Sequence, residues 1–228
     1  FLKNKYEIVN DPSMAEIIVV NTCGFIESAK EEAINTIFEM AEYKNENCKY
    51  LIVTGCLVER YKEELEKEMP EVDLFIKFSE YDSIWEQIDK LIVSKTEGKL
   101  DYLDRVISTG KNYAYLRIAD GCNNFCTFCA IPYIRGRFKS RKMEDILEEA
   151  STLAKKGIKE IIVIAQDTTK YGSDIYNEPK LAELLNKLSK IEGIEWIRFL
   201  YAYPETITEE LIYEVKTNPK ICKYFDIP

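Results

Sequence analysis

The chain contains no histidine, and its apolar stretches are all short. Without histidine, a closed four-ligand zinc site would have to be completed by cysteine alone. The longest apolar runs, such as 17–20 and 161–165, have the length of a buried strand and not of a membrane span. No secretory signal is visible, although Phe1 stands where a start methionine would be expected, so the true N-terminus is expected to lie upstream.

The cysteines are few and scattered. Their number, seven, is odd, and they do not form the dense framework of a small secreted domain, so a reducing cytoplasm is the expected location. The formal net charge of -9 argues against a large nucleic-acid footprint on this part of the chain. It would suit a basic partner, but acidity for solubility alone explains it equally well. With 46% hydrophobic and 31% charged residues, the composition is globular.

In residues 1–92, β-branched runs alternate with helical patterns, which is typical of a parallel sheet with crossover helices. The predicted strands are 16–21, 50–54 and 72–78. The predicted helices are 27–44, 59–69 and 84–92. The sequence therefore predicts an α/β fold that begins with a small, doubly wound, flavodoxin-like parallel-sheet domain.

The periodicity fails over 93–112, which we interpret as an interdomain linker, and βα alternation resumes over 113–228. The predicted strands of this second part are 113–119, 160–165, 196–201 and 224–227. The predicted helices are 143–156, 180–190 and a third one opened by a capping box of Thr206 and Glu209. This pattern predicts part of a βα barrel, and because the sequence ends inside the fourth predicted strand, we expect the chain to be a fragment.

Cys122, Cys126 and Cys129 follow the first strand of this barrel in a C-x3-C-x2-C spacing. They are therefore expected at the C-terminal face, where active-site loops gather. An iron-sulfur cluster held by three cysteines keeps one iron open for a small molecule. The alternatives are incidental cysteines, or a zinc site completed by Cys222 or Cys23.

Cys23 and Cys56 each lie just past the C-terminal end of a predicted strand. In a doubly wound sheet such ends lie side by side at the crevice where ligands bind, so the two cysteines could meet. Two unrelated buried cysteines are the alternative interpretation. Cys48 and Cys222 match no motif, and we interpret both as small hydrophobic residues.

The cysteine triplet, with Phe128 directly before its last member and a barrel strand before its first, resembles the radical S-adenosylmethionine superfamily. Four segments together resemble the methylthiotransferases within it: NTCGFIESAKEEA, TGCLVERYKEEL, AYLRIADGCNNFCTFCAIPYIRGRFKSR and IAQDTTKYG. The resemblance covers residues from about 6 to 228. It is strongest to the branch that methylthiolates an aspartate of a small-subunit ribosomal protein.

This resemblance implies that the triplet binds a 4Fe-4S cluster and that S-adenosylmethionine chelates its fourth iron. One electron would cleave the sulfonium, and the deoxyadenosyl radical released would abstract hydrogen from the substrate. Phe128 would lie near the adenine, with an ordinary packing aromatic as the alternative. Gln166 and Asp167, at the end of the second barrel strand, would help to hold S-adenosylmethionine or substrate, or would only cap the next helix.

The family also has a second 4Fe-4S cluster, which carries or donates the sulfur. Cys23 and Cys56 match two of its three ligands, and the third would precede Phe1. The rest of the barrel and a C-terminal substrate-binding domain are also absent, so we expect no turnover by this chain alone. The expected partners are the ribosomal protein and an electron donor such as flavodoxin or ferredoxin. The alternative functions are methylthiolation of a tRNA adenosine by the sister enzyme and a non-catalytic metal-binding module.

Overall fold

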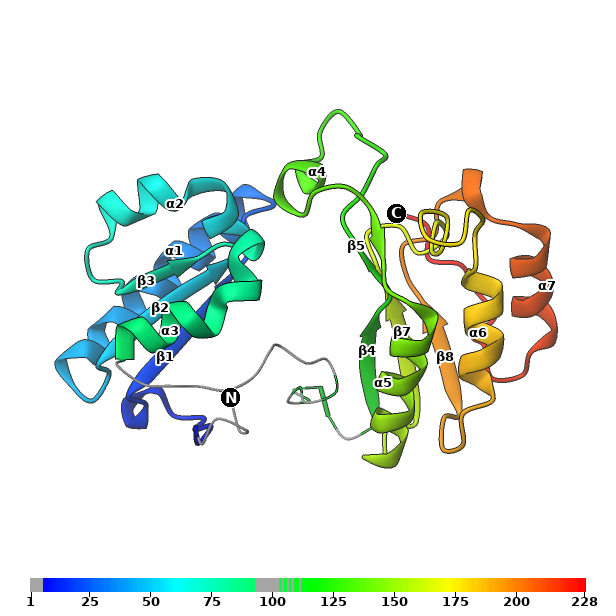
Figure 1. Ribbon diagram of the computed structural model, residues 1–228, viewed down its shortest axis with the longest axis horizontal. Coiled ribbons are helices and arrows are strands. Elements are labelled where there is room, and N and C mark those ends of the chain that lie inside the picture. Colours follow the sequence, from blue (N-terminus) through cyan, green and yellow to red (C-terminus); the bar gives the residue numbers. More distant parts are fainter. Residues whose placement is uncertain (1–5, 93–102, 104, 106, 108, 111) are drawn as a thin grey trace. The chain divides into compact units, whose positions relative to one another are not determined.

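A computed structural model describes residues 6–92, 103, 105, 107, 109, 110 and 112–228 (Figure 1). The chain divides into two compact units, Phe1–Leu100 and Asp101–Pro228. Residues 93–102 of the predicted linker lie outside the described residues. None of the described helices is both long and apolar enough to cross a membrane.

The first unit is a parallel sheet with helices on both of its faces. The strands lie in the order β1 (Ile17–Thr22), β2 (Tyr50–Gly55), β3 (Leu74–Ile76). The helices are α1 (Glu27–Glu42), α2 (Cys56–Glu68) and α3 (Ile84–Ile92), with 3-10 turns η2 (Pro12–Met14), η3 (Tyr43–Asn45) and η4 (Phe78–Ser83). These elements follow the predicted strands and helices, with small shifts at their ends.

Alternate residues of β2 face opposite sides of this sheet, as the pleat of a strand requires. Leu51 and Val53 pack in one cluster with residues of α1 and α2. Ile52 packs in the other cluster with Ile88 of α3. Both faces are thus covered, and the prediction of a doubly wound parallel-sheet unit is confirmed.

Helix α2 begins at Cys56, three residues before its predicted start. The reason is Gly55, whose φ of 108° turns the chain directly from β2 into the helix. A Cβ at Gly55 would lie 2.3 Å from the carbonyl oxygen of Thr22. Any other residue would therefore be strained at this φ and would also clash with Thr22. The turn places Cys56 in the first helical position.

The second unit contains a parallel sheet in the order β4 (Tyr113–Arg117), β7 (Glu160–Ile164), β8 (Trp196–Phe199). A second, antiparallel pair consists of β5 (Ala119–Asp120) and β6 (Lys139–Ser140). The helices are α4 (Ile131–Ile134), α5 (Met143–Lys155), α6 (Leu181–Ser189) and α7 (Glu209–Thr217), with the 3-10 turn η6 (Pro204–Thr206). This alternation of parallel strands and helices is the predicted partial βα barrel.

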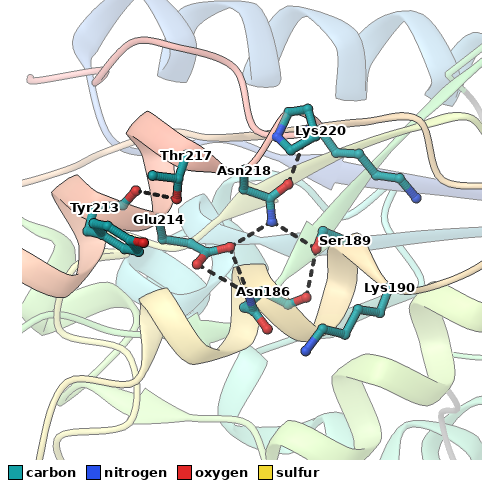
Figure 2. A pocket seen from close by; sticks show the side chains of 9 residues that line it. Asn186, Ser189, Lys190, Tyr213, Glu214, Thr217, Asn218 and Lys220 are labelled. Atoms are coloured by element: carbon teal, nitrogen blue, oxygen red, sulfur yellow. Dashed lines mark hydrogen bonds between the residues drawn. The ribbon is translucent and has the colours of Figure 1, made fainter.

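Helices α6 and α7 are joined by polar side chains along the groove between them (Figure 2). Asn186 and Asn218 both donate to the Glu214 carboxylate, at 3.0 and 2.6 Å. Asn218 also donates to the Ser189 hydroxyl at 2.9 Å. The polar groups of this groove therefore bond to one another and hold the two helices together.

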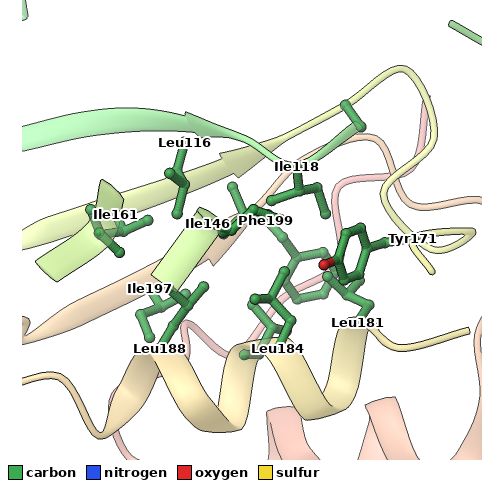
Figure 3. Packing of buried hydrophobic residues seen from close by; sticks show 14 of the residues in the cluster. Leu116, Ile118, Ile146, Ile161, Tyr171, Leu181, Leu184, Leu188, Ile197 and Phe199 are labelled. Atoms are coloured by element: carbon green, nitrogen blue, oxygen red, sulfur yellow. The ribbon is translucent and has the colours of Figure 1, made fainter. Parts of the chain in front are cut away.

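The core of the second unit lies between its sheet and its helices (Figure 3). Leu184 and Leu188 of α6 point toward Ile197 and Phe199 of β8. All four side chains are almost fully excluded from solvent. Tyr171, also fully buried, closes this core and donates its hydroxyl to the Arg141 carbonyl at 3.1 Å.

Three predicted details of this unit are wrong. The strand predicted over 113–119 ends at Arg117, because the chain then pairs with β6 as β5. Helix α7 is capped by Thr208, whose hydroxyl accepts the Leu211 N–H at 3.2 Å, while Thr206 lies in η6. Residues 224–227 form no strand.

An isolated bridge replaces that predicted fourth strand. It joins Ile221 to Ile197 in parallel fashion. Beyond it, the Ala202 N–H donates to the Asp226 carbonyl at 2.8 Å, and the Tyr201 N–H donates to the Asp226 carboxylate, also at 2.8 Å. Around Asp226 the contact to the segment after β8 is thus made partly by a side chain and not by a regular backbone ladder.

Described residues of the predicted linker from 103 onward belong to the second unit. Ile107 lies against its core. Arg105 donates to the Tyr115 carbonyl at 2.5 Å and lies 3.3 Å from a carboxylate oxygen of the buried Glu149. These residues therefore contribute to the packing of the second unit.

Candidate functional site

The cysteine triplet lies on a loop whose two ends are held together by β5 and β6. At the loop's start, Gly121 has φ of 71°, and a Cβ there would lie 2.2 Å from the Arg137 carbonyl oxygen. The Cys122 N–H donates to the Gly136 carbonyl at 3.2 Å. The backbone of the loop thus closes on itself directly beside the first cysteine, past the C-terminal end of β4.

The three cysteines differ in exposure: Cys122 is buried, and Cys126 and Cys129 are half-buried. The Asn124 N–H donates to the Cys122 sulfur at 3.4 Å, and the Cys129 N–H donates to the Cys126 carbonyl at 2.9 Å. Burial raises the pKa of the Cys122 thiol; the Asn124 N–H opposes this shift, and the nearby charge of Asp167 adds to it.

Within the described ranges, no group of three cysteine, aspartate or glutamate side chains is arranged to hold a metal ion. The structure therefore brings the triplet onto one closed loop without gathering its sulfurs. The donor chemistry nevertheless suits an iron-sulfur cluster, because the segment 121–130 contains three thiols and no carboxylate or imidazole.

Phe128, the aromatic residue before the last cysteine, is 87% exposed, so it is not a packing aromatic. Phe125 lies on the same loop in a left-handed conformation, with φ of 48°. The guanidinium of Arg137 lies 4.3 Å from the centre of the Phe125 ring, which is a cation–π contact. The loop thus leaves the Phe128 ring open to solvent, whereas the Phe125 ring contacts Arg137 in the segment that leads back to β6.

Gln166 and Asp167 follow β7, at the same end of the sheet as the cysteine loop. Asp167 is fully buried, and it accepts the Asn124 side-chain amide at 3.1 Å. The side-chain oxygen of Gln166 is buried and has no hydrogen-bond partner among the described residues. An unpartnered buried acceptor is costly, and a donor such as the amino group of an amino-acid ligand would satisfy it.

Three residues near the cysteines were not selected from the sequence: Asn124, Lys170 and Tyr203. Lys170 donates to the side-chain oxygen of Asn124. Burial raises the pKa of Tyr203, and the charges of Cys122 and Cys126 act in the same direction. The first two residues belong to the segments that carry the family resemblance; Tyr203 is brought in by the fold from beyond β8.

In the first unit, the strand register pairs Thr22 with Gly55. Cys23 and Cys56 each follow one of these partners, so both lie at the same end of the sheet, as expected. Cys23 is exposed and Cys56 is buried at the start of α2. The two cysteines are thus placed on neighbouring loops, with one thiol open to solvent.

The two cysteines outside the motifs differ from each other. Cys48 is buried in the core of the first unit, where burial raises its thiol pKa. Cys222 is half-buried beside the isolated bridge of the second unit. Neither lies on a loop that carries another cysteine.

Two protein-family models match the chain. The first, described as "Uncharacterized protein family UPF0004", matches residues 1–77. The second, described as "Radical SAM superfamily", matches residues 116–228. The first match falls on the unit with Cys23 and Cys56, and the second on the unit with the triplet.

Similar curated proteins cover the whole chain. "Ribosomal protein uS12 methylthiotransferase RimO" of Alkaliphilus oremlandii is 65% identical over an alignment of 230 positions that covers 100% of this chain and 52% of that protein. The protein of the same name from Acetivibrio thermocellus is 56% identical over an alignment of 241 positions that covers 99% of this chain and 53% of that protein. The chain spans about half the length of the curated relatives it matches.

Solved structures with low sequence identity share the fold. TsrM of Kitasatospora setae, a radical S-adenosylmethionine methyltransferase solved with cobalamin and a [4Fe-4S] cluster, matches with a TM-score of 0.65 and 11% identity, over 90% of this chain and 48% of that one. The cobalamin-dependent radical enzyme OxsB matches with a TM-score of 0.54 and 14% identity, over 90% of this chain and 33% of that one.

The similarity to RimO proteins along the whole of this chain, the two matched family models and the cysteine motif on its βα scaffold agree with one another. The chain belongs to the methylthiotransferase family of radical S-adenosylmethionine enzymes.

Proposed function

We propose that this chain is part of a radical S-adenosylmethionine methylthiotransferase that converts a C–H bond of an aspartate in ribosomal protein uS12 to C–SCH3. The observation that carries the proposal is the closed loop of Cys122, Cys126 and Cys129 at the C-terminal end of a parallel βα sheet. The 65% identity to a uS12 methylthiotransferase supports the choice of substrate.

The triplet would hold a 4Fe-4S cluster through its three sulfurs. Bound there, the cluster would supply the electron that cleaves S-adenosylmethionine to a hydrogen-abstracting radical. The chain's part is to present three thiols and no competing ligand on one short loop, whose ends β5 and β6 fix. The exposed Phe128 ring is free to stack on an adenine.

Gln166 would contact S-adenosylmethionine through its unpartnered side-chain oxygen, which can accept a hydrogen bond from the methionyl amino group. Asp167, which follows it, is fully buried and has its own partners inside the protein. We therefore assign the contact with the cofactor to Gln166 and a supporting role to Asp167.

Cys23 and Cys56 would be two ligands of a second 4Fe-4S cluster, the one that carries or donates sulfur. Their place at one end of the β1–β2 pair supports this assignment. Cys23 and Cys56 supply two thiols where the triplet supplies three, so we expect this chain alone to bind the triplet's cluster more firmly.

The partners we propose are uS12 as substrate and a low-potential electron donor such as flavodoxin or ferredoxin. The reducing cytoplasm is the compartment we propose, since no disulfide joins any of the seven cysteines and clusters of this kind need reduced thiols. The net charge of -9 favours a protein substrate over a nucleic acid.

The test uses the full-length protein, reconstituted anaerobically with iron and sulfide. We expect iron and sulfide for two 4Fe-4S clusters, cleavage of S-adenosylmethionine with a reductant, and the methylthio mass increase on an aspartate of uS12. Purified tRNA is assayed in parallel. Modification of tRNA alone would replace the substrate by an adenosine, and zinc retention without cleavage would leave only a metal-binding module.

A further inference from the structure

Asp167 is a carboxylate with no exposed surface, and each of its oxygens is used inside the protein. One oxygen accepts the Thr169 hydroxyl at 2.8 Å and the Lys170 N–H at 3.3 Å. The other accepts the side-chain amide of Asn124 at 3.1 Å and lies 3.6 Å from the Lys170 ammonium. A buried charge needs such partners, and here one of them comes from the cysteine loop.

Asn124 lies between Cys122 and Cys126 and is held at three points. Its side-chain NH2 faces Asp167, its side-chain oxygen accepts from Lys170, and its backbone N–H donates to the Cys122 sulfur at 3.4 Å. The amide has only one orientation that suits both charges, since the oxygen must face the ammonium and the NH2 must face the carboxylate. The side chain is therefore fixed, and the backbone beside Cys122 with it.

The same network reaches the segment that follows β8. The Thr169 hydroxyl, which donates to Asp167, accepts the Tyr203 N–H at 3.1 Å and the Thr206 hydroxyl at 2.7 Å. Segments after β7 and β8 are thus tied to the loop that follows β5. All of these contacts lie within the second unit.

We propose that Asn124, Asp167 and Lys170 form a polar clamp that positions the loop of Cys122 and Cys126 for binding its cluster. In this proposal, which rests on the proposed function, Asp167 is a positioning residue that acts through Asn124. Hydrogen-bonded residues behind metal ligands commonly orient those ligands in this way.

If the network only stabilised the fold, each of its side chains would matter, but a second substitution would not restore what the first one lost. The decisive variants are therefore Asp167→Asn, Asn124→Asp and the two together. In Asp167→Asn, the new amide either points its NH2 at the NH2 of Asn124 or points it at the Thr169 hydroxyl, which then loses its acceptor. The second sets two carboxylates against each other. The double variant restores one donor–acceptor pair and keeps both the total charge and the partner of Lys170.

Each variant is made in the full-length protein and compared in three ways. Iron and sulfide binding are titrated anaerobically, the reduced cluster's EPR spectrum is recorded with and without S-adenosylmethionine, and hydrogen exchange of residues 121–130 is measured in the metal-free protein. Asp145→Asn, an exposed carboxylate of α5, is the matched control.

We expect each single variant to lose about 10-fold to 100-fold in iron affinity, with an altered EPR spectrum and faster exchange of 121–130. The double variant is expected to recover most of this loss, and Asp145→Asn to behave as wild type. Wild-type behaviour of both single variants, or a double variant as impaired as their sum, would overturn the clamp.

The exchange measurement separates this proposal from the proposed function. If the wild-type protein binds no cluster at these cysteines, the proposed function fails. The clamp would still be supported by loss of protection in the single variants and its return in the double variant, and it would be overturned by unchanged protection in all of them.

Discussion

Gly24 lies directly against the backbone of Leu57: a Cβ on Gly24 would be 2.8 Å from both the Leu57 Cα and the Leu57 nitrogen. The loop after β1 therefore touches the first turn of α2 with no space between them. Because Cys23 precedes one contact residue and Cys56 precedes the other, this packing sets how closely the two cysteine-bearing segments approach each other.

We expect Gly24→Ala to lower the free energy of unfolding by about 1–3 kcal/mol, because the added methyl meets rigid backbone. Urea unfolding followed by circular dichroism measures the change. Gly110→Ala is the control, since a Cβ there meets nothing within 4 Å. Equal stability of the two variants would mean that the two loops are not in contact.

Gly121 and Gly136 separate two reasons for requiring glycine in the cysteine loop. Both have positive φ, 71° and 75°, but only a Cβ at Gly121 would clash, at 2.2 Å from the Arg137 carbonyl oxygen. We expect Gly136→Ala to cost only about 1–2 kcal/mol of backbone strain. Gly121→Ala is expected to cost more and to abolish iron binding at the triplet.

Iron content and urea unfolding of both variants, measured in the full-length protein, check this prediction. If Gly121→Ala retains iron as well as Gly136→Ala does, the closure of the loop beside Cys122 is not needed for binding.

The sequence predicted the strands best where buried β-branched runs decide them. Strand β2 was predicted over 50–54 and is observed over Tyr50–Gly55. The sequence-based prediction was wrong where a single contact decides between neighbouring residues. Thr206 and Thr208 are equally good helix caps by residue type, and the structure shows Thr208 as the cap. Residues 224–227 have the composition of a strand, but they form none, and the Asp226 side chain accepts one of the backbone N–H groups that follow β8.

The sequence predicted those residues of the candidate site that belong to a motif or lie at the end of a strand. The spacing of the triplet selected Cys122, Cys126 and Cys129, and the strand ends selected Gln166 and Asp167. The link between Asn124 and Asp167 joins residues 43 positions apart. Such a pairing depends on how β4 and β7 align, which no local pattern contains.

Glu149 is a buried carboxylate of α5 that faces two arginines. Arg141 donates to it at 2.7 Å, and Arg105 lies 3.3 Å from its other oxygen. Removing one member of a buried ion pair is strongly destabilising, so Glu149→Gln is expected to cost about 3 kcal/mol. Urea unfolding checks this value, with the exposed neighbour substituted as Glu148→Gln for comparison. A loss no larger than that of Glu148→Gln would show that the ion pairs contribute nothing.

Cysteine substitutions test which thiols hold iron. In this chain, reconstituted alone, we expect iron and sulfide for one cluster, because the triplet supplies three thiols on one loop and Cys23 and Cys56 supply only two. Cys126→Ala should remove that iron, whereas Cys222→Ala, which lies outside every motif and is also half-buried, should keep it. Iron and sulfide analysis with the visible absorption spectrum measures the outcome. Retention of iron by Cys126→Ala would exclude the triplet as its binding site.

The Glu80 carboxylate gives the first unit a predictable dependence on pH. Burial, the largest influence, raises the pKa of Glu80, but the Lys77 N–H at 2.9 Å and the Lys62 ammonium at 2.9 Å together lower it below the ordinary value. A carboxyl whose pKa is depressed by folding stabilises the fold at neutral pH and loses that effect as the pH falls through the folded-state pKa. Because the side chain is 34% exposed, solvent screens the pair and the contribution is expected to stay below about 1 kcal/mol.

Glu80→Gln should therefore be less stable than wild type near neutral pH, and the difference should shrink as the pH is lowered through the carboxyl range. Urea unfolding at a series of pH values measures it. Glu66→Gln, an exposed carboxylate of α2, is the matched control and should show no such convergence. If the stability difference between wild type and Glu80→Gln stays constant down to acid pH, the charge of Glu80 is not its cause.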